Sequence, residues 1–179
     1  MLSNPRDSFE PGGQGSTSLA VELVGLHFRV RGSVNLGSHL RLSDLLNFGS
    51  QALALTVSEA VVLDGTGGEA ADAVSALDVR LERICLVLDH SGYVPPPPRE
   101  EMGVAKTSQR LVALTDAHLV TATFFTHPSA EPNGYLLATE PVWMPLTDVH
   151  VRSLAAPGIT FEAAFGILNR RSIAASSVL

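Results

Sequence analysis

Residues 21–56 read VELVGLHFRVRGSVNLGSHLRLSDLLNFGSQALALT, and residues 112–147 read VALTDAHLVTATFFTHPSAEPNGYLLATEPVWMPLT. Laid over each other without a gap, at an offset of 91 residues, the two stretches share eight identical positions out of 36. The identical pairs are Val21/Val112, Leu23/Leu114, His27/His118, Ser38/Ser129, Leu45/Leu136, Leu46/Leu137, Leu55/Leu146 and Thr56/Thr147. This agreement is several times the chance level, and an internal repeat decides the architecture before other features do. The sequence therefore predicts two diverged copies of one small domain, each of about 75 residues.

The apolar residues within each copy predict short strands. Residues 21–32 alternate apolar and polar side chains for much of their length, which is the period of a half-buried strand. Residues 40–49 interrupt the pattern, because Leu42, Leu45 and Leu46 share one face of a helical turn that Gly49 can end. Further strands are expected within 52–63, 77–88, 109–126 and 143–151, and in a hairpin over 159–173 that turns at Leu168-Asn169-Arg170-Arg171. The expected fold is all-β: two tandem small antiparallel β-barrels, Sm-like or SH3-like, with a short helical turn in the first.

Composition sets the expected domain boundaries. Residues 1–18 are rich in Gly, Ser, Pro and charge, so we expect a disordered tail there. Four consecutive prolines, Pro95–Pro98, favour an extended polyproline II spacer, with docking to a Pro-binding domain as the alternative. The first barrel is then expected over residues 19–92, the Pro-rich linker over 93–108 and the second barrel over 109–179.

The overall charge restricts the class of partner. A net charge of −6 argues against a general affinity for nucleic acid or acidic membranes, because both need a basic surface. The single cysteine, Cys85, lies in the apolar run 84–88, where we expect a small buried hydrophobe. Neither a signal peptide nor an apolar run of about 18 residues is visible, so we expect a cytoplasmic protein with no membrane span.

Four segments carry a family resemblance: Arg29-Val30-Arg31-Gly32, Arg41-Leu42-Ser43-Asp44-Leu45-Leu46-Asn47, Leu53-Ala54-Leu55-Thr56 and Ile167-Leu168-Asn169-Arg170-Arg171-Ser172-Ile173. Together they resemble an uncharacterised bacterial family of small β-barrel domains. The second segment is intact only in the first copy, and the asparagine-arginine segment only in the second. The resemblance covers about half of the chain. It implies a fold and no established activity.

No group of residues indicates an enzyme. Asp89-His90-Ser91 contains the residue types of a hydrolase triad, but sequence neighbours cannot hold the geometry that a triad needs. The six histidines lack the paired spacing of strong metal sites. The loop Gly65–Glu69 lacks the Lys-Ser/Thr of a phosphate-binding loop. We therefore expect no catalytic residue, no metal ligand and no cofactor.

Arginines are the candidate interaction residues. Arg170 and Arg171 are expected at a hairpin tip, where two guanidiniums could bind a carboxylate or a phosphate. Arg29, Arg31 and Arg41 could form a second basic face. The leading hypothesis is a non-enzymatic protein-interaction or assembly module that contacts a protein partner, or copies of itself, through sheet edges and loops. The alternative is an Sm-like module that binds RNA or a nucleotide through an arginine patch.

Aromatic side chains in the second copy leave two interpretations open. Phe124, Phe125, Tyr135 and Trp143 could form an exposed apolar edge that marks a protein interface. The other interpretation is that they are buried in the second barrel.

Overall fold

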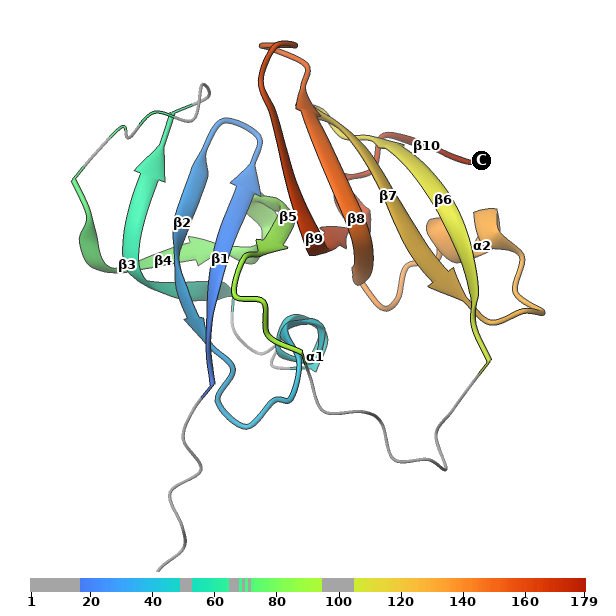
Figure 1. Ribbon diagram of the computed structural model, residues 1–179, viewed down its shortest axis with the longest axis horizontal. Coiled ribbons are helices and arrows are strands. Elements are labelled where there is room, and N and C mark those ends of the chain that lie inside the picture. The colour runs from blue at the N-terminus through green and yellow to red at the C-terminus, as the bar shows by residue number, and fades with distance from the viewer. Residues whose placement is uncertain (1–16, 49–52, 65–67, 69, 71, 95–104) are drawn as a thin grey trace, which may run out of the picture.

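The computed structural model describes residues 17–48, 53–64, 68, 70, 72–94 and 105–179. These residues form one ten-stranded antiparallel sheet with two short α-helices (Figure 1). The first half holds β1 (Ser18–Gly25), β2 (Arg29–Asn35), α1 (Leu42–Phe48), β3 (Ala54–Leu63), β4 (Val74–Arg80), the 3₁₀ turn η1 (Leu81–Arg83) and β5 (Ile84–Asp89). The second half holds β6 (Thr107–Leu114), β7 (His118–Thr126), α2 (Pro132–Leu137), β8 (Trp143–Ser153), β9 (Thr160–Asn169), the 3₁₀ turn η3 (Arg170–Ser172) and β10 (Ala175–Val178).

The two halves have the same strand order. In the first half β1 to β4 form a meander and β5 returns to pair with β1; in the second half β6 to β9 form a meander and β10 returns to pair with β6. The halves are joined where β5, the fifth strand of the first, pairs with β9, the fourth strand of the second. The internal repeat is therefore visible in the topology, and its two units share one sheet.

The all-β prediction is confirmed, but two tandem closed barrels are not seen. Across the described residues the order is β10-β6-β7-β8-β9-β5-β1-β2-β3-β4, so the sheet is open and ends at β10 and β4. Neither half closes on itself. The side of β5 that does not pair with β1 pairs with β9 instead of with β4, and β10 pairs with β6 but not with β9. The predicted boundary at the proline run lies in residues 95–104, outside the described residues.

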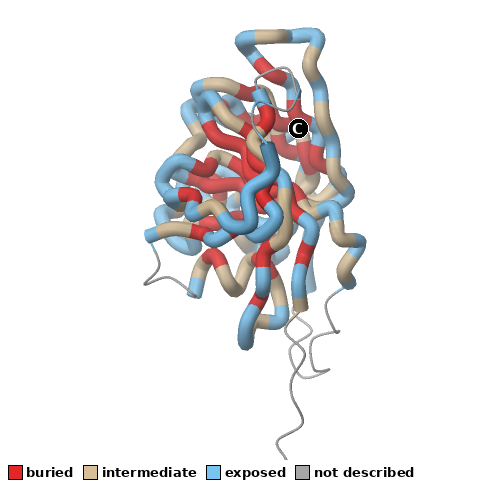
Figure 2. The backbone as a smooth tube through the Cα atoms, turned by 90° about the vertical axis from the view of Figure 1, so that its left-hand side faces the viewer, coloured by how far each residue is buried: buried red, intermediate tan, exposed pale blue. Residues whose placement is uncertain are grey.

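Each half has its own apolar core, and each core takes side chains from the other half. Trp143 and Ile167 of the second half lie in the first core, while Leu86 and Leu88 of the first half lie in the second core. Figure 1 shows the bent half-sheets side by side, and Figure 2 shows buried segments inside and exposed ones at the projecting β8–β9 turn. The shared side chains bind the two halves into one packed unit.

Both helices lie between the second and third strands of their halves. The predicted turn of the first copy is confirmed as α1, which buries Leu42 and Leu46, with Leu45 half-buried. The sequence did not predict α2. There the side chain of Glu131 accepts hydrogen bonds from the first-turn N–H groups of Asn133 and Gly134, as an N-cap does.

The pairing register corrects the gapless alignment of the copies. Val24 lies opposite Arg29 in the first hairpin, and Leu114 lies opposite Leu119 in the second, so equivalent residues of these strands are 90 apart. Positive φ angles mark irregularities at Glu59 in β3 and Asp148 in β8, which are 89 apart. The offset of 91 is therefore one residue too large in the first two strands and two too large in the third.

A slip of one residue exchanges the two faces of a strand. Leu23 was matched with Leu114, yet Leu23 is fully buried and Leu114 is 36% exposed. At an offset of 90 the equivalent of Leu23 is Ala113, which is also fully buried. The same topology makes β10 the equivalent of β5.

Candidate functional site

The two arginines predicted at a hairpin tip lie in η3, which is a crossover between two separated strands. β9 pairs with β8 and β5, whereas β10 pairs with β6, so β9 and β10 form no hairpin. Arg170 is only 6% exposed; its guanidinium lies 4.2 Å from the ring centre of Tyr135, and its Nη1 donates to the carbonyl oxygen of Glu140 at 3.4 Å. Arg171 is exposed, with Nη2 3.6 Å from Oε1 of Glu140. Of these two arginines, only Arg171 presents its guanidinium to solvent.

Arg29 and Arg31 converge on the buried carboxylate of Glu22. Arg29 Nε donates to Oε1 of Glu22, and Arg31 Nε donates to Oε2 at 2.8 Å. Burial raises the pKa of Glu22, but the two hydrogen bonds and the two positive charges outweigh it, so the pKa lies below its ordinary value. Arg41 is half-buried just before α1.

The five candidate arginines do not gather on one face. The Cζ atom of Arg29 lies 4.1 Å from the ring centre of Phe161, which is near the start of β9. Arg170, in contrast, follows the last residue of that strand. A strand of this length separates its ends by about 30 Å.

The ring of Phe161 joins the two halves. Arg29 of the first half covers its face, and His118 of β7 meets it edge-on, with ring centres 5.9 Å apart at 78°. Burial lowers the pKa of His118, and the charge of Arg29 lowers it further. The histidine is therefore neutral at pH 7, and this group acts as a structural clamp at the junction.

Two asparagines from the family-resembling segments complete the junction. Asn47 of α1 donates from Nδ2 to the carbonyl oxygen of Trp143 at 2.9 Å, and its Oδ1 accepts from the N–H of Trp143 at 3.0 Å. Trp143 is the strand partner of Asn169, whose Nδ2 donates to the carbonyl oxygen of Ile84 at 3.0 Å. Each half thus supplies one asparagine side chain that bonds to the backbone of the other half.

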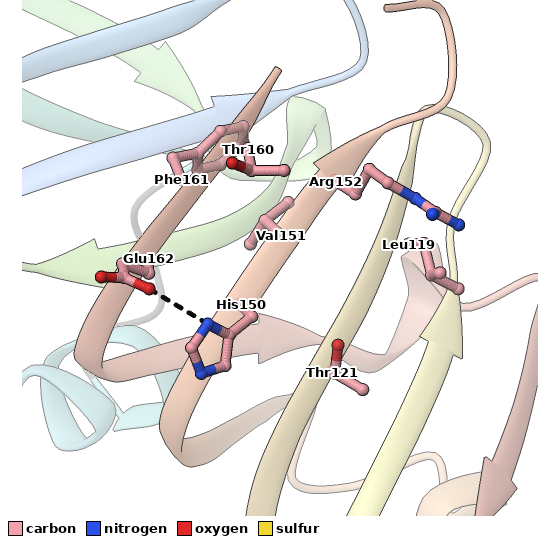
Figure 3. A pocket seen from close by; sticks show the side chains of 8 residues that line it. All are labelled: Leu119, Thr121, His150, Val151, Arg152, Thr160, Phe161 and Glu162. Atoms are coloured by element: carbon pink, nitrogen blue, oxygen red, sulfur yellow. Dashed lines mark ion pairs between the residues drawn. The ribbon is translucent and has the colours of Figure 1, made fainter. Parts of the chain in front are cut away.

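A groove of about 590 Å³ runs over the outer face of β7, β8 and β9 (Figure 3). Its main polar feature is an ion pair between Nδ1 of His150 and Oε2 of Glu162 at 3.1 Å. Both side chains are more than half exposed, so the pair is solvated and contributes little binding energy. The remaining lining residues, also drawn there, are Leu119, Thr121, Val151, Arg152, Thr160 and Phe161. The groove lacks the buried, mutually oriented acid and base that catalysis needs.

A larger hollow, of about 890 Å³, lies at the junction between the halves. It is lined by both 3₁₀ turns and by Trp143 and Asn169. Its arginines lie beside carboxylates: Arg83 Nε is 3.8 Å from Oε1 of Glu82, and Arg171 lies beside Glu140. These charges offset one another and leave no strong preference for an anion.

Nucleophilic and metal chemistry find no support in the described residues. Asp89 Oδ1 accepts from the N–H of Ser91 at 2.8 Å and from its hydroxyl at 2.5 Å, so the two side chains bond locally in a turn. His90 faces Glu22 instead, at 3.7 Å. Burial raises the pKa of the half-buried Cys85, so its thiol stays protonated. Among the described residues, no three His, Cys, Asp or Glu lie together as a metal site.

The aromatic side chains of the second copy are largely interior. Phe124 and Trp143 are buried, and Tyr135 stacks on Phe124 with ring centres 5.9 Å apart. Phe125 alone is substantially exposed, at 43%. These residues therefore form core and not a contiguous apolar edge.

The open ends of the sheet are the remaining candidate site. β4 (VSALDVR) and β10 (ASSV) each pair on one side only, and most of their side chains are exposed. Sequence reasoning anticipated sheet edges in general but did not locate these two strands. The sequence does contain an indication of β10, because a short polar run follows the turn predicted at residues 168–171.

Comparison with protein-family models, with curated proteins and with solved structures found no match to this chain. None of the helices in the described part of the chain has the length and apolar character needed to cross a membrane.

Proposed function

We propose that this chain is a non-enzymatic assembly module, built from a duplicated small-barrel unit, that binds another polypeptide strand at the open edges of its sheet. The observation that carries the proposal is the internal β5·β9 pair, in which two units of this chain already bind each other edge to edge. Strand addition supplies affinity through backbone hydrogen bonds and needs no pocket.

The composition of the outer edges supports the same function. Natural sheet edges usually carry Lys, Pro or a cover that prevents pairing. Neither β4 nor β10 contains Lys or Pro, and β10 carries no charged residue. Within the described part of the chain, neither edge carries these two residues, which leaves the outward backbone groups available to a partner strand.

The arrangement of the arginines favours a protein partner over RNA. Two of the five candidates neutralise Glu22, and Arg170 is buried under Tyr135. RNA binding by an Sm-like module would need these charges on one surface beside stacking aromatics.

Site-specific photocrosslinking in the native host tests the proposal. Ser177 of β10 and Ala76 of β4, both exposed, are replaced one at a time by a photoreactive phenylalanine analogue, with exposed Arg152 on the interior strand β8 as the matched control. We expect protein adducts at both edge positions and none at Arg152. Equal protein adducts at Arg152, or adducts to RNA alone, would contradict strand addition at the edges.

A further inference from the structure

We propose that the strand added at each edge belongs to a second copy of this chain, so that β10 of one copy pairs with β4 of the next. This inference rests on the proposed function and names its partner. The internal junction pairs a fifth strand, β5, with a fourth strand, β9. The outer edges are the remaining fourth strand, β4, and the remaining fifth strand, β10. A β4·β10 contact between copies would therefore repeat a contact that the chain already makes within itself.

The repeat fixes the register of this contact. Residues of β4 and β5 are equivalent to residues of β9 and β10 at an offset of 89, because Arg80 and Asn169 both pair with the first residue of the third strand. At the junction, Val87 lies opposite Ile167 and Asp89 lies opposite Phe165. The equivalent pairs between copies are Ala175–Val79, Ser176–Asp78, Ser177–Leu77 and Val178–Ala76.

The hydrogen-bonding phase of β10 agrees with this register. The N–H of Leu179 donates to the carbonyl oxygen of Arg110 at 2.9 Å. Antiparallel strands alternate between residues that bond to one neighbour and residues that face away from it. Counted back from Leu179 through the regular pairs of β10, Ser177 bonds toward β6, while Ser176 and Val178 direct their N–H groups to the open side. The N–H of Ala174, before β10 begins, also donates to β6, at the carbonyl oxygen of Leu114, so the regular alternation starts at Ala175.

The phase of β4 is complementary. The N–H of Leu81 donates to the carbonyl oxygen of Leu53 at 3.0 Å, so by the same alternation Asp78 and Ala76 direct their N–H groups outward. The register derived from the junction sets these two residues opposite Ser176 and Val178. The outward groups of both edges thus meet, whereas a slip of one residue would set outward groups against inward ones.

Exposed apolar side chains lie where the second copy would cover them. Val24 is fully buried beside the junction, and its equivalent Leu114, beside the open β10 edge, is 36% exposed. Leu46 of α1 and Leu136 of α2 are both buried and are 90 apart, so the highly exposed Leu137 is equivalent to Asn47, and the highly exposed Leu53 is equivalent to Val142 at the offset of 89. Asn47 and Val142 both line the hollow at the junction, from opposite halves. Head-to-tail pairing would bring Leu53 of one copy to Leu137 of the next.

The contact between copies is expected to be weaker than the internal junction. Ala175 and Ser177 replace Leu86 and Leu88, and the clamping Asn169 is replaced by Arg80. Assembly should therefore be reversible and depend on concentration. Because the two surfaces differ, the contact is heterologous and produces a ring if the rotation closes or a filament if it does not.

Two single substitutions block the two edges separately. Ser176→Pro removes an outward N–H from β10, and Ala76→Pro removes one from β4; proline is tolerated on the open side of an edge strand. Ser176→Ala and Ala76→Ser are the matched controls, since both keep the N–H. Light scattering across a dilution series measures the mass.

We expect the natural chain and both controls to form assemblies larger than a dimer, and each proline variant to have the mass of one chain. An equimolar mixture of the two proline variants should form a one-to-one dimer, because each supplies the edge that the other lacks. Leu137→Glu, a change on an exposed helix residue, should weaken assembly, while thermal unfolding at a dilution where the natural chain is a single chain should stay the same.

Two results would overturn the inference. If the Ser176→Pro variant alone still forms a dimer, the β4 edges pair with each other and the head-to-tail arrangement is wrong. If the natural chain stays a single chain at every concentration, copies do not bind each other. The proposed function would then depend on whether the photocrosslinking experiment gives edge-specific adducts to other proteins.

Discussion

Glu22 carries a buried charge that depends on its arginine partners. Its carboxylate is 1% exposed and Arg29 is 6% exposed, so the pair is buried and each charge depends on the other. Removing one partner of a buried pair leaves an uncompensated charge, whereas replacing both with apolar residues is often tolerated.

We therefore expect Glu22→Leu alone to lower the free energy of unfolding by about 3–5 kcal/mol, and Glu22→Leu with Arg29→Met to cost clearly less. Urea unfolding of the three proteins measures the difference. A double variant that is as unstable as the single one would show that packing, and not charge, dominates at this position.

His118 makes stability depend on pH. Its pKa is below the ordinary value of 6.5 in the folded chain, so the folded state binds fewer protons than the unfolded state once the pH falls past that value. Stability must therefore decrease as the pH falls through that range. Glu22 acts in the same direction at lower pH, below its ordinary value of 4.5.

We expect the natural chain to lose stability between about pH 7 and pH 5, and His118→Leu to show a flatter profile over this range. Chemical denaturation at several pH values provides the measurement. Parallel profiles for the two proteins would assign the dependence to another group.

At the scale of elements, the sequence predicted the class of structure better than the registers. The leucine spacing in α1 is a local signal and is confirmed. The period of two in residues 21–32 indicated strand correctly but not its burial, because residues 21–25 of β1 are all buried and the chain turns before β2 begins at Arg29. The repeat was detectable because equivalent strands keep similar residues. Its exact offset was not, because the connection between the second and third strands is one residue shorter in the second half, so the offset is 90 before it and 89 after it. A single gapless offset of 91 therefore matches identical leucines that lie on opposite faces.

The candidate site was harder to predict than the fold. Arg29 and Arg31 looked like an exposed basic pair, since nothing local in the sequence shows that Glu22 lies opposite Arg31 on the neighbouring strand. The crossover at Arg170 depends on β10 pairing with β6, about 60 residues earlier in the chain. Contacts of this range are set by the topology and not by local patterns.

The register correction has a direct test in two leucines that the gapless alignment made equivalent. Leu23→Ala should cost about 2–5 kcal/mol of stability, because Leu23 is fully buried in the first core. Leu114→Ala should cost less than about 1 kcal/mol, because its side chain is partly exposed. Denaturant unfolding at high dilution measures both variants. Equal losses in the free energy of unfolding would support the offset of 91 against the corrected offset of 90.

At the scale of the whole molecule, the question is whether two repeated units behave as two domains. The shared sheet and the exchanged core residues argue for one cooperative unit, because unfolding either half would expose apolar side chains of the other.

Ile167 tests this directly, since it belongs to the second half, is fully buried, and lies in the first core. Ile167→Ala should lower the free energy of unfolding by about 2–5 kcal/mol and should reduce amide protection in β2 and β7 alike, because both halves open together. Leu111→Ala, equally buried in the second core and away from the junction, is the matched control and should give the same uniform loss. Hydrogen exchange resolved by residue measures both variants. If Leu111→Ala reduced protection only in β6 to β10 and left β1 to β5 unchanged, the halves would open independently, and the β5·β9 pair would be a reversible contact of the kind we propose between copies.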